Sequence, residues 1–92
     1  MGENTQLRDS GEWSVYIVRC RDASLYTGIA KDARARVERH NTGKGAAYTR
    51  TRRPVRLLYV KSGLTRSEAL IHEARIKRMP RPKKLELAKI PS

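Results

Sequence analysis

A single carboxylate on the apolar side of a predicted helix is the first feature of this sequence that could do chemistry. On a helical wheel Glu73 falls between Ala69 and Leu70, with Ile76 close by. An acid in such a position is costly unless it has a partner. Two partners are open: an ion pair with Lys77 four residues later, or a hard divalent cation whose other oxygen ligands are waters and a substrate phosphate.

Four further side chains are of types that serve phosphate chemistry. Arg36 and His40 are four residues apart and share one helical face. An arginine fork holds a phosphate through two hydrogen bonds, and a histidine exchanges protons near neutral pH. The alternative is a solvated basic face shared with Arg39. Tyr16 and Tyr26 fall in consecutive predicted strands, where pairing would bring both hydroxyls together, although strand tyrosines more often serve packing.

Three segments with β-branched and aromatic residues must form the sheet that positions these groups. They span residues 13–20, 25–29 and 55–61. The first has apolar residues on both of its faces, and the polar turn 21–24 predicts that the first two form a hairpin. Strict alternation in the third strand assigns Val55, Leu57 and Tyr59 to one face and Leu58 and Val60 to the other.

The segment between the second and third strands divides into a helix and a loop. Asp32 is a good N-cap for a helix that runs to His40. Residues 42–54 then combine glycines, one tyrosine and four cations, a composition that predicts a mobile basic loop over a ligand surface. Strands in a hairpin, a helix and a third strand together indicate a small α/β layer.

Two more helices are expected after the third strand. Thr65 and Glu68 have the spacing of a capping box, so a helix should begin there and run to Met79, before Pro80. A last helix should span residues 83–89. Its first turn tolerates Pro82, and its inward-packing residues are predicted to be Leu85 and Ala88.

Composition and charge bound the class of protein. Ninety-two residues correspond to one domain, residues 13–92, preceded by a polar leader, residues 1–12, that we expect to be disordered. Residues 13–92 hold 20 Lys and Arg against six Asp and Glu, a net charge of +14. Such a charge favours nucleic acid as a partner; the alternatives are a basic structural protein of the ribosome and a solvated surface without a specific partner.

The cysteine content and the lack of long apolar runs indicate where in the cell the protein is expected. The single Cys20 can form no internal disulfide, and no apolar run is long enough to span a bilayer or to serve as a signal peptide. We therefore expect a protein of the reducing cytoplasm without a membrane association.

Five positions in order resemble the GIY-YIG nuclease family. These are the motif SVY ending at Tyr16, the motif YTG beginning at Tyr26, and then Arg36, His40 and Glu73. The stretches LYTGIAKDARARVERHNTGKGAAYTR and SEALIHEARIKRM are similar to the small stand-alone UPF0213 group of that family. The resemblance covers residues 13–89 and implies an α+β fold, a three-stranded antiparallel sheet flanked by helices.

The resemblance also implies a role for each of the five residues. Tyr16 would act in general-base chemistry on the attacking water, and Tyr26 would help to position phosphate or water. Arg36 would steady the charged phosphate, His40 would lie near the scissile group, and Glu73 would bind one Mg²⁺ or Mn²⁺. The pKa of a tyrosine is about 10, so a tyrosine that acts as a base at neutral pH needs nearby cations to lower its pKa. Arg36 and the metal are expected to do this for Tyr16.

The function implied is hydrolysis of phosphodiester bonds in DNA, possible roles being DNA repair or processing. Where some members carry an asparagine after the metal-binding helix, this chain reads RPKKLELAK, so a lysine there is expected to contact phosphate. DNA is favoured over RNA, an unknown protein could supply targeting, and a monomer or weak dimer is expected. The alternatives are a non-catalytic nucleic-acid-binding module of the same fold and a basic RNA- or ribosome-associated protein.

The expected nucleic-acid-binding residues are Lys31, Arg39, Lys44, Arg50, Arg52, Arg53, Lys77, Lys83 and Lys84.

Overall fold

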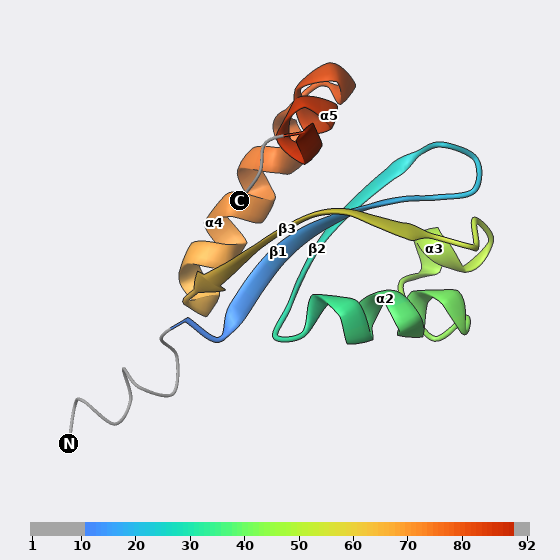
Figure 1. Cartoon of the computed structure of the whole chain (residues 1–92), viewed down its shortest axis with the longest axis horizontal. Coiled ribbons are helices and arrows are strands. Elements are labelled where there is room, and N and C mark those ends of the chain that lie inside the picture. The colour runs from blue at the N-terminus through green and yellow to red at the C-terminus, as the bar shows by residue number, and fades with distance from the viewer. Residues whose placement is uncertain (1–10, 90–92) are drawn as a thin grey trace.

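The chain folds as three strands with helices on both faces of the sheet (Figure 1). The computed structural model describes residues 11–89. Both strand pairs are antiparallel, in the order β2-β1-β3, which confirms the expected three-stranded antiparallel α+β fold. The elements are β1 (Trp13–Arg19), β2 (Leu25–Ala30), α2 (Ala33–Asn41), α3 (Ala47–Arg50), β3 (Arg56–Leu64), α4 (Arg66–Arg78) and α5 (Arg81–Lys89).

Strand β1 occupies the middle of the sheet because its residues are suited to burial on both sides. Residues 14–18 are all buried, as the sequence predicts. The expected hairpin is confirmed: β1 pairs with β2 in an antiparallel register that sets Tyr16 opposite Gly28. A backbone hydrogen bond of 2.8 Å from the amide of Cys20 to the carbonyl of Ser24 closes the turn.

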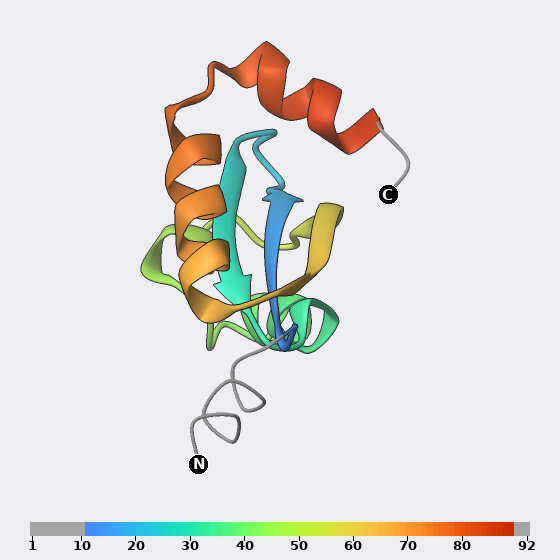
Figure 2. The same ribbon diagram turned by 90° about the vertical axis from the view of Figure 1, so that its left-hand side faces the viewer.

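Alternate residues of β1 pack into two separate apolar clusters, one on each face of the sheet. Helix α2 covers one face and α4 the other, and Figure 2 shows α4 along one side of the sheet with α5 turning from the end of α4 over the end of the sheet. The cluster on the α2 face contains Tyr16, Val18, Cys20, Ala30, Ala33 and Val55. The cluster on the α4 face contains Val15, Ile17, Leu64, Ala69 and Ile76.

A bulge in β3 overturns the face assignment made for that strand. Ile17 pairs with Tyr59 and the next residue, Val18, pairs with Leu57, so Leu58 is passed over. The extra residue reverses the alternation. Leu57 therefore packs on the α2 face with Val60, whereas Tyr59 packs on the α4 face.

Two of the three predicted helix starts are confirmed. The side chain of Asp32 accepts a hydrogen bond of 3.1 Å from the amide of Ala35 at the start of α2. At α4 the capping box is complete: Thr65 Oγ1 accepts from the amide of Glu68 at 3.1 Å, and the Glu68 carboxylate accepts from the amide of Thr65 at 2.9 Å. These caps fix where each helix begins, and hence which side chains face the sheet.

The segment 42–54, predicted to be a loop, contains some regular structure. It contains the short helix α3, and its Thr49 is fully buried. The side-chain amide of Asn41 ties the segment to the sheet, because it donates to the carbonyl of Val55 at 3.0 Å and its oxygen accepts from the Val55 amide at 2.6 Å. The short helix was not predicted from the sequence, because the contacts that hold the segment link residues far apart in sequence.

The last helix also differs from the prediction. It begins at Arg81, two residues before the expected start, with Pro82 in its first turn. Leu85 and Ala88 are only half-buried, and it is Leu87 that packs against the α4-face cluster. The predicted leader lies, for residues 1–10, outside the described residues. No helix within residues 11–89 is long and apolar enough to cross a membrane.

Candidate active site

The phenol of Tyr16 lies across β2, and Gly28 leaves the room for it. A Cβ at position 28 would lie 2.6 Å from the hydroxyl oxygen of Tyr16, far inside van der Waals contact. The absence of a side chain there allows the ring to pass over the strand, where it is 1% exposed. The pairing of Tyr16 with Gly28 thus directs the hydroxyl toward α2.

On α2 the hydroxyl of Tyr16 meets His40. Tyr16 Oη and His40 Nε2 are 3.0 Å apart, and both side chains are buried. The ring of Tyr26 packs edge-on against the imidazole, with 5.4 Å between ring centroids. Arg36, one turn before His40, lies close enough to the Tyr16 phenol for its positive charge to lower the pKa of that group. The structure therefore brings together four of the five residues that the sequence singled out.

A cleft of about 370 Å³ opens beside these groups. It is polar and basic on one side, and two cations predicted to bind nucleic acid, Arg39 and Lys44, line it. A phosphate in this cleft would lie among fixed positive charges. The lining residues are Tyr26, Arg36, Arg39, His40, Lys44, Gly45 and Ala46.

Burial sets the protonation states of the Tyr16 and His40 pair. It raises the pKa of Tyr16 to about 12, with the negative charge that Tyr26 can carry adding to the effect. Arg36 lowers the pKa of Tyr16, as the sequence suggested, but desolvation outweighs it, so the expected net decrease is not present without a metal. Burial, and then Arg36, lower the pKa of His40 from 6.5. At neutral pH Tyr16 therefore keeps its proton and His40 is a neutral imidazole.

Glu73 approaches from α4, on the other face of the sheet. Its side chain is 20% exposed and pairs with Lys77, with 3.3 Å between carboxylate oxygen and Nζ. The ion pair considered from the sequence is thus present. The charge of Glu73 also acts on the phenol, since it is one of the causes that raise the pKa of Tyr16.

The donor set at Glu73 fits one kind of metal. Within residues 11–89 no group of three His, Cys, Asp or Glu side chains could enclose an ion. That excludes, for this part of the chain, a closed site of the zinc type. A partly exposed single carboxylate fits a hard cation such as Mg²⁺, which keeps several waters and takes substrate phosphate oxygens as further ligands.

The sequence reasoning missed Thr49 and Gly45, which hold His40 from the other side. Thr49 Oγ1 lies 2.7 Å from His40 Nδ1, and the backbone of Gly45 packs so closely that a Cβ there would collide with the imidazole. The only available signal was the pair of glycines in the segment 42–54, which predicts close backbone approach without naming its partner.

An aromatic stack supports Tyr26. Its ring stacks on that of Tyr48, with 5.9 Å between centroids, and the guanidinium of Arg52 lies 4.0 Å above the Tyr48 ring. Arg52 in turn pairs with Asp22 at 3.1 Å and donates to the carbonyl of Tyr48. Arg52, predicted to contact nucleic acid, is thus placed as a support for the site.

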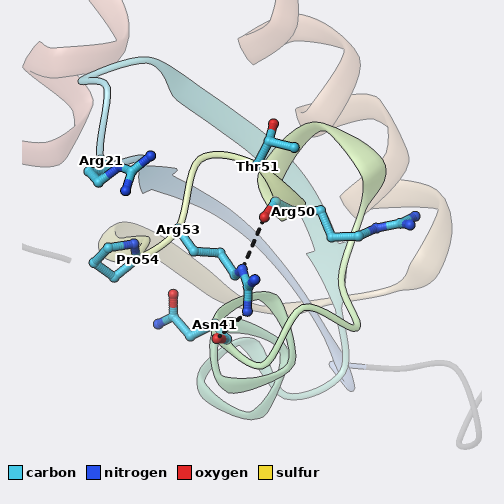
Figure 3. A pocket seen from close by; sticks show the side chains of 6 residues that line it. All are labelled: Arg21, Asn41, Arg50, Thr51, Arg53 and Pro54. Atoms are coloured by element: carbon cyan, nitrogen blue, oxygen red, sulfur yellow. Dashed lines mark hydrogen bonds between the residues drawn. The ribbon is translucent and has the colours of Figure 1, made fainter.

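A second basic pocket lies beside the segment 42–54 (Figure 3). The guanidinium of Arg53 donates to the carbonyls of Arg50 and Asn41, at 3.0 and 3.2 Å. The side chain of Arg50 extends away from Arg53 and Arg21. Of the residues predicted for nucleic acid, Arg50 and Arg53 therefore line this pocket rather than the cleft that His40 lines.

The other predicted nucleic-acid contacts are dispersed. Lys31 pairs with Glu12 at 3.2 Å, near Trp13. Lys83 and Lys84 lie on α5, on the face of the sheet opposite to α2. The structure thus does not bring these three lysines to the cleft.

Comparisons with known proteins agree with this geometry. The family model of the GIY-YIG catalytic domain matches residues 12–86. UPF0213 proteins of Staphylococcus aureus strains Mu50 and N315 are 60% identical over 75 residues, which cover 82% of this chain and 92% of each relative.

Two solved structures are also similar. The solution NMR structure of the UPF0213 protein BH0048 from Bacillus halodurans is 41% identical, with a TM-score of 0.52 over 82% of this chain and 80% of that one. The solution NMR structure of EF2693 from E. faecalis is 38% identical, with a TM-score of 0.55 over 84% of this chain and 80% of that one. A nuclease-type fold, the Tyr16 and His40 arrangement and these matches agree: the chain belongs to the GIY-YIG family, in its UPF0213 group.

Proposed function

We propose that this protein is a metal-dependent endonuclease that hydrolyses phosphodiester bonds in DNA, in DNA repair or processing. The observation that carries the proposal is the 3.0 Å hydrogen bond between Tyr16 and His40 beside Arg36 and a basic cleft. These three side chains and Tyr26, which packs against His40, are of the types needed to activate a water and to hold a phosphate.

The protonation states suggest how the water is activated. Tyr16 holds its proton, because its pKa is about 12, and His40 is neutral. As the attacking water loses a proton to Tyr16 Oη, Tyr16 gives its own proton to His40 Nε2. The proton count balances, and no free phenolate has to exist beforehand. A high pKa of Tyr16 is therefore compatible with a role as a base.

Arg36 and Glu73 act on the phosphate from opposite sides in this proposal. Arg36 is placed to bind a phosphoryl oxygen and to stabilise the charge that develops there. The carboxylate of Glu73 would hold one Mg²⁺ or Mn²⁺, which supplies charge neutralisation at the phosphoryl and leaving oxygens when bound. Lys77 then exchanges its salt bridge with Glu73 for a contact with nucleic acid.

The cations around the cleft support a nucleic-acid substrate. Arg39 and Lys44 line the cleft, and Arg50 and Arg53 line the neighbouring pocket. Such contacts bind phosphate without reading bases, so the affinity should be salt-dependent and nearly independent of sequence. We favour DNA over RNA, with a separate protein supplying the targeting.

Cleavage of a substrate panel tests this proposal. Single-stranded, duplex, nicked, flapped and branched DNA, with RNA for comparison, are incubated with Mg²⁺ or Mn²⁺. Glu73→Gln should lose at least about 10²-fold in rate, because the charged ligand of the metal is removed. Glu86→Gln, an exposed acid on α5, is the matched control and should cleave like wild type. Equal rates for all three proteins would refute the proposal.

One observation favours a second candidate, a nucleic-acid-binding module without turnover. Glu73 already has a partner in Lys77, so the carboxylate is satisfied without a metal. That candidate predicts binding that is independent of metal and unchanged by Glu73→Gln, with no cleavage of any substrate. A clear preference for RNA in the same panel would instead indicate a basic RNA-associated protein.

A further inference from the structure

The buried hydrogen bonds at the site continue past His40 to the main chain of α3. Tyr16 Oη and His40 Nε2 are 3.0 Å apart, and His40 Nδ1 and Thr49 Oγ1 are 2.7 Å apart. Thr49 Oγ1 donates in turn to the carbonyl of Ala46 at 2.9 Å. Tyr16 and His40 are each 1% exposed and Thr49 is fully buried, so bulk water has little access to these hydrogen bonds.

The hydrogen bond from Thr49 to the Ala46 carbonyl fixes the donor and the acceptor in the other two hydrogen bonds. A carbonyl can only accept, so the single hydroxyl proton of Thr49 is used on Ala46. Thr49 Oγ1 then has only lone pairs to offer to His40, and Nδ1 must carry the proton that fills the 2.7 Å contact. A neutral imidazole with its proton on Nδ1 has a lone pair on Nε2, where it accepts the proton of the Tyr16 hydroxyl.

We propose that Thr49 is a positioning residue that holds the proton of neutral His40 on Nδ1 and so keeps Nε2 free to take the proton of Tyr16. With the other tautomer, Nε2–H would donate to Tyr16 Oη and the relay could not accept a proton. The catalytic meaning of this role rests on the proposed function, whereas the tautomer itself does not.

The surroundings of His40 make Thr49 the group that decides the tautomer. Tyr16 from β1 and Tyr26 from β2 face the ring, Arg36 lies one turn earlier on α2, and Arg39 and Lys44 line the same cleft. None of these side chains has a carboxylate. A hydroxyl orients the imidazole without stabilising its charged form, as a carboxylate would, which agrees with the lowered pKa of His40.

The local structure holds Thr49 in place for this task. The hydrogen bond of its side chain to Ala46, three residues earlier, is made within the single turn of α3. The backbone of Gly45 packs against the imidazole on the Nδ1 side. The short helix therefore serves to present one hydroxyl to one ring nitrogen.

Nitrogen NMR of the imidazole tests the tautomer directly. In ¹⁵N-labelled wild type at neutral pH, Nδ1 of His40 should show the shift of a protonated nitrogen and Nε2 that of an unprotonated one. Thr49→Val, which keeps the shape and removes the hydroxyl, should move population to the Nε2–H tautomer; Thr49→Ser should retain the wild-type pattern. A proton on Nε2 in wild type overturns the inference, and this result does not depend on whether Thr49→Val folds.

Cleavage kinetics then separate this inference from the proposed function. With an active wild type, Thr49→Val should lower kcat about 10²-fold, at the lower end of what general acid–base catalysis contributes. KM for DNA should change little, and Thr49→Ser should recover most of kcat. An unchanged kcat in a folded Thr49→Val overturns the positioning role. A wild type that has the Nδ1–H tautomer but cleaves nothing refutes the proposed function and supports the inference.

Discussion

The two faces of the sheet differ in what they bury, although the same strand supplies both. On the α2 face, β1 contributes Tyr16, which forms a buried chain of polar groups with His40 and Thr49. On the α4 face its neighbours Val15 and Ile17 pack among apolar side chains, Trp13 and Tyr59 included. Consecutive residues of one strand thus reach a buried set of polar hydrogen bonds on one face and an apolar cluster on the other.

This difference indicates that the α4 face mainly stabilises the fold and that the α2 face mainly holds reactive groups. The apolar cluster on the α4 face should supply most of the stability, since buried apolar area is the dominant favourable term in folding. The polar chain on the α2 face gives much less net stability, because each hydrogen bond replaces one to water. It holds two titratable groups in fixed protonation states, which is what chemistry requires.

The largest effect on stability should come from the α4 face. Ile17 is 0% exposed, so Ile17→Ala should lower the free energy of unfolding by about 2–5 kcal/mol. The matched control is Ile71→Ala on the outer side of α4, where the side chain is 53% exposed and the loss should stay within about 0.5 kcal/mol. Urea unfolding measures both, and equal losses would contradict the assignment of the α4 face as the stabilising core.

A smaller effect should appear as acid sensitivity of the α2 face. Because the pKa of His40 is lowered from 6.5 in the folded protein, its contribution to stability is fully present above pH 6.5 and is lost as the pH falls through the lower, folded pKa. Each unit of difference corresponds to about 1.4 kcal/mol.

The measurement is the free energy of unfolding as a function of pH between 7 and about 5, below the reference pKa of histidine. His40→Gln should flatten the acid slope, and His72→Gln on α4 is the matched control that should leave it in place. An unchanged slope in His40→Gln would contradict the buried, neutral state of His40.

The smallest effect should come from the cap of α4. Thr65→Ala removes the acceptor for the amide of Glu68 and should cost about 1 kcal/mol. Ser67→Ala, on the exposed first turn, is the control and should be nearly neutral. Cleavage should be unchanged in both, because neither side chain lines the cleft and Glu73 lies in the middle of α4, away from its capped end. A larger loss of activity than of stability in Thr65→Ala would show that the two faces are coupled.

Local signals in the sequence were enough to predict most of the elements. The apolar pattern of β1, Asp32 as an N-cap and the capping box at Thr65 each act over a few residues, and the structure agrees with all three. The bulge at Leu58 was not predicted, because one passed-over residue depends on how β1 and β3 pair rather than on either strand alone.

The candidate site was only partly visible in the sequence. Arg36 and His40 could be placed together because they share a helix, and Tyr16 and Tyr26 because they share a hairpin. Thr49 could not be found, since its partner His40 is nine residues away and the helix that presents it has four residues. The raised pKa of Tyr16 depends on burial, a property of the packed structure that no residue spacing reveals.

A pair of tyrosine substitutions tests the central claim most directly. Tyr16→Phe and Tyr59→Phe each remove one hydroxyl, the first on the α2 face and the second, half-buried, on the α4 face. Cleavage of the best substrate from the panel, with Mg²⁺ or Mn²⁺, is measured for both variants and for wild type. The account predicts at least about a 10²-fold loss of kcat for Tyr16→Phe and wild-type cleavage for Tyr59→Phe. Equal rates for the two variants would contradict it.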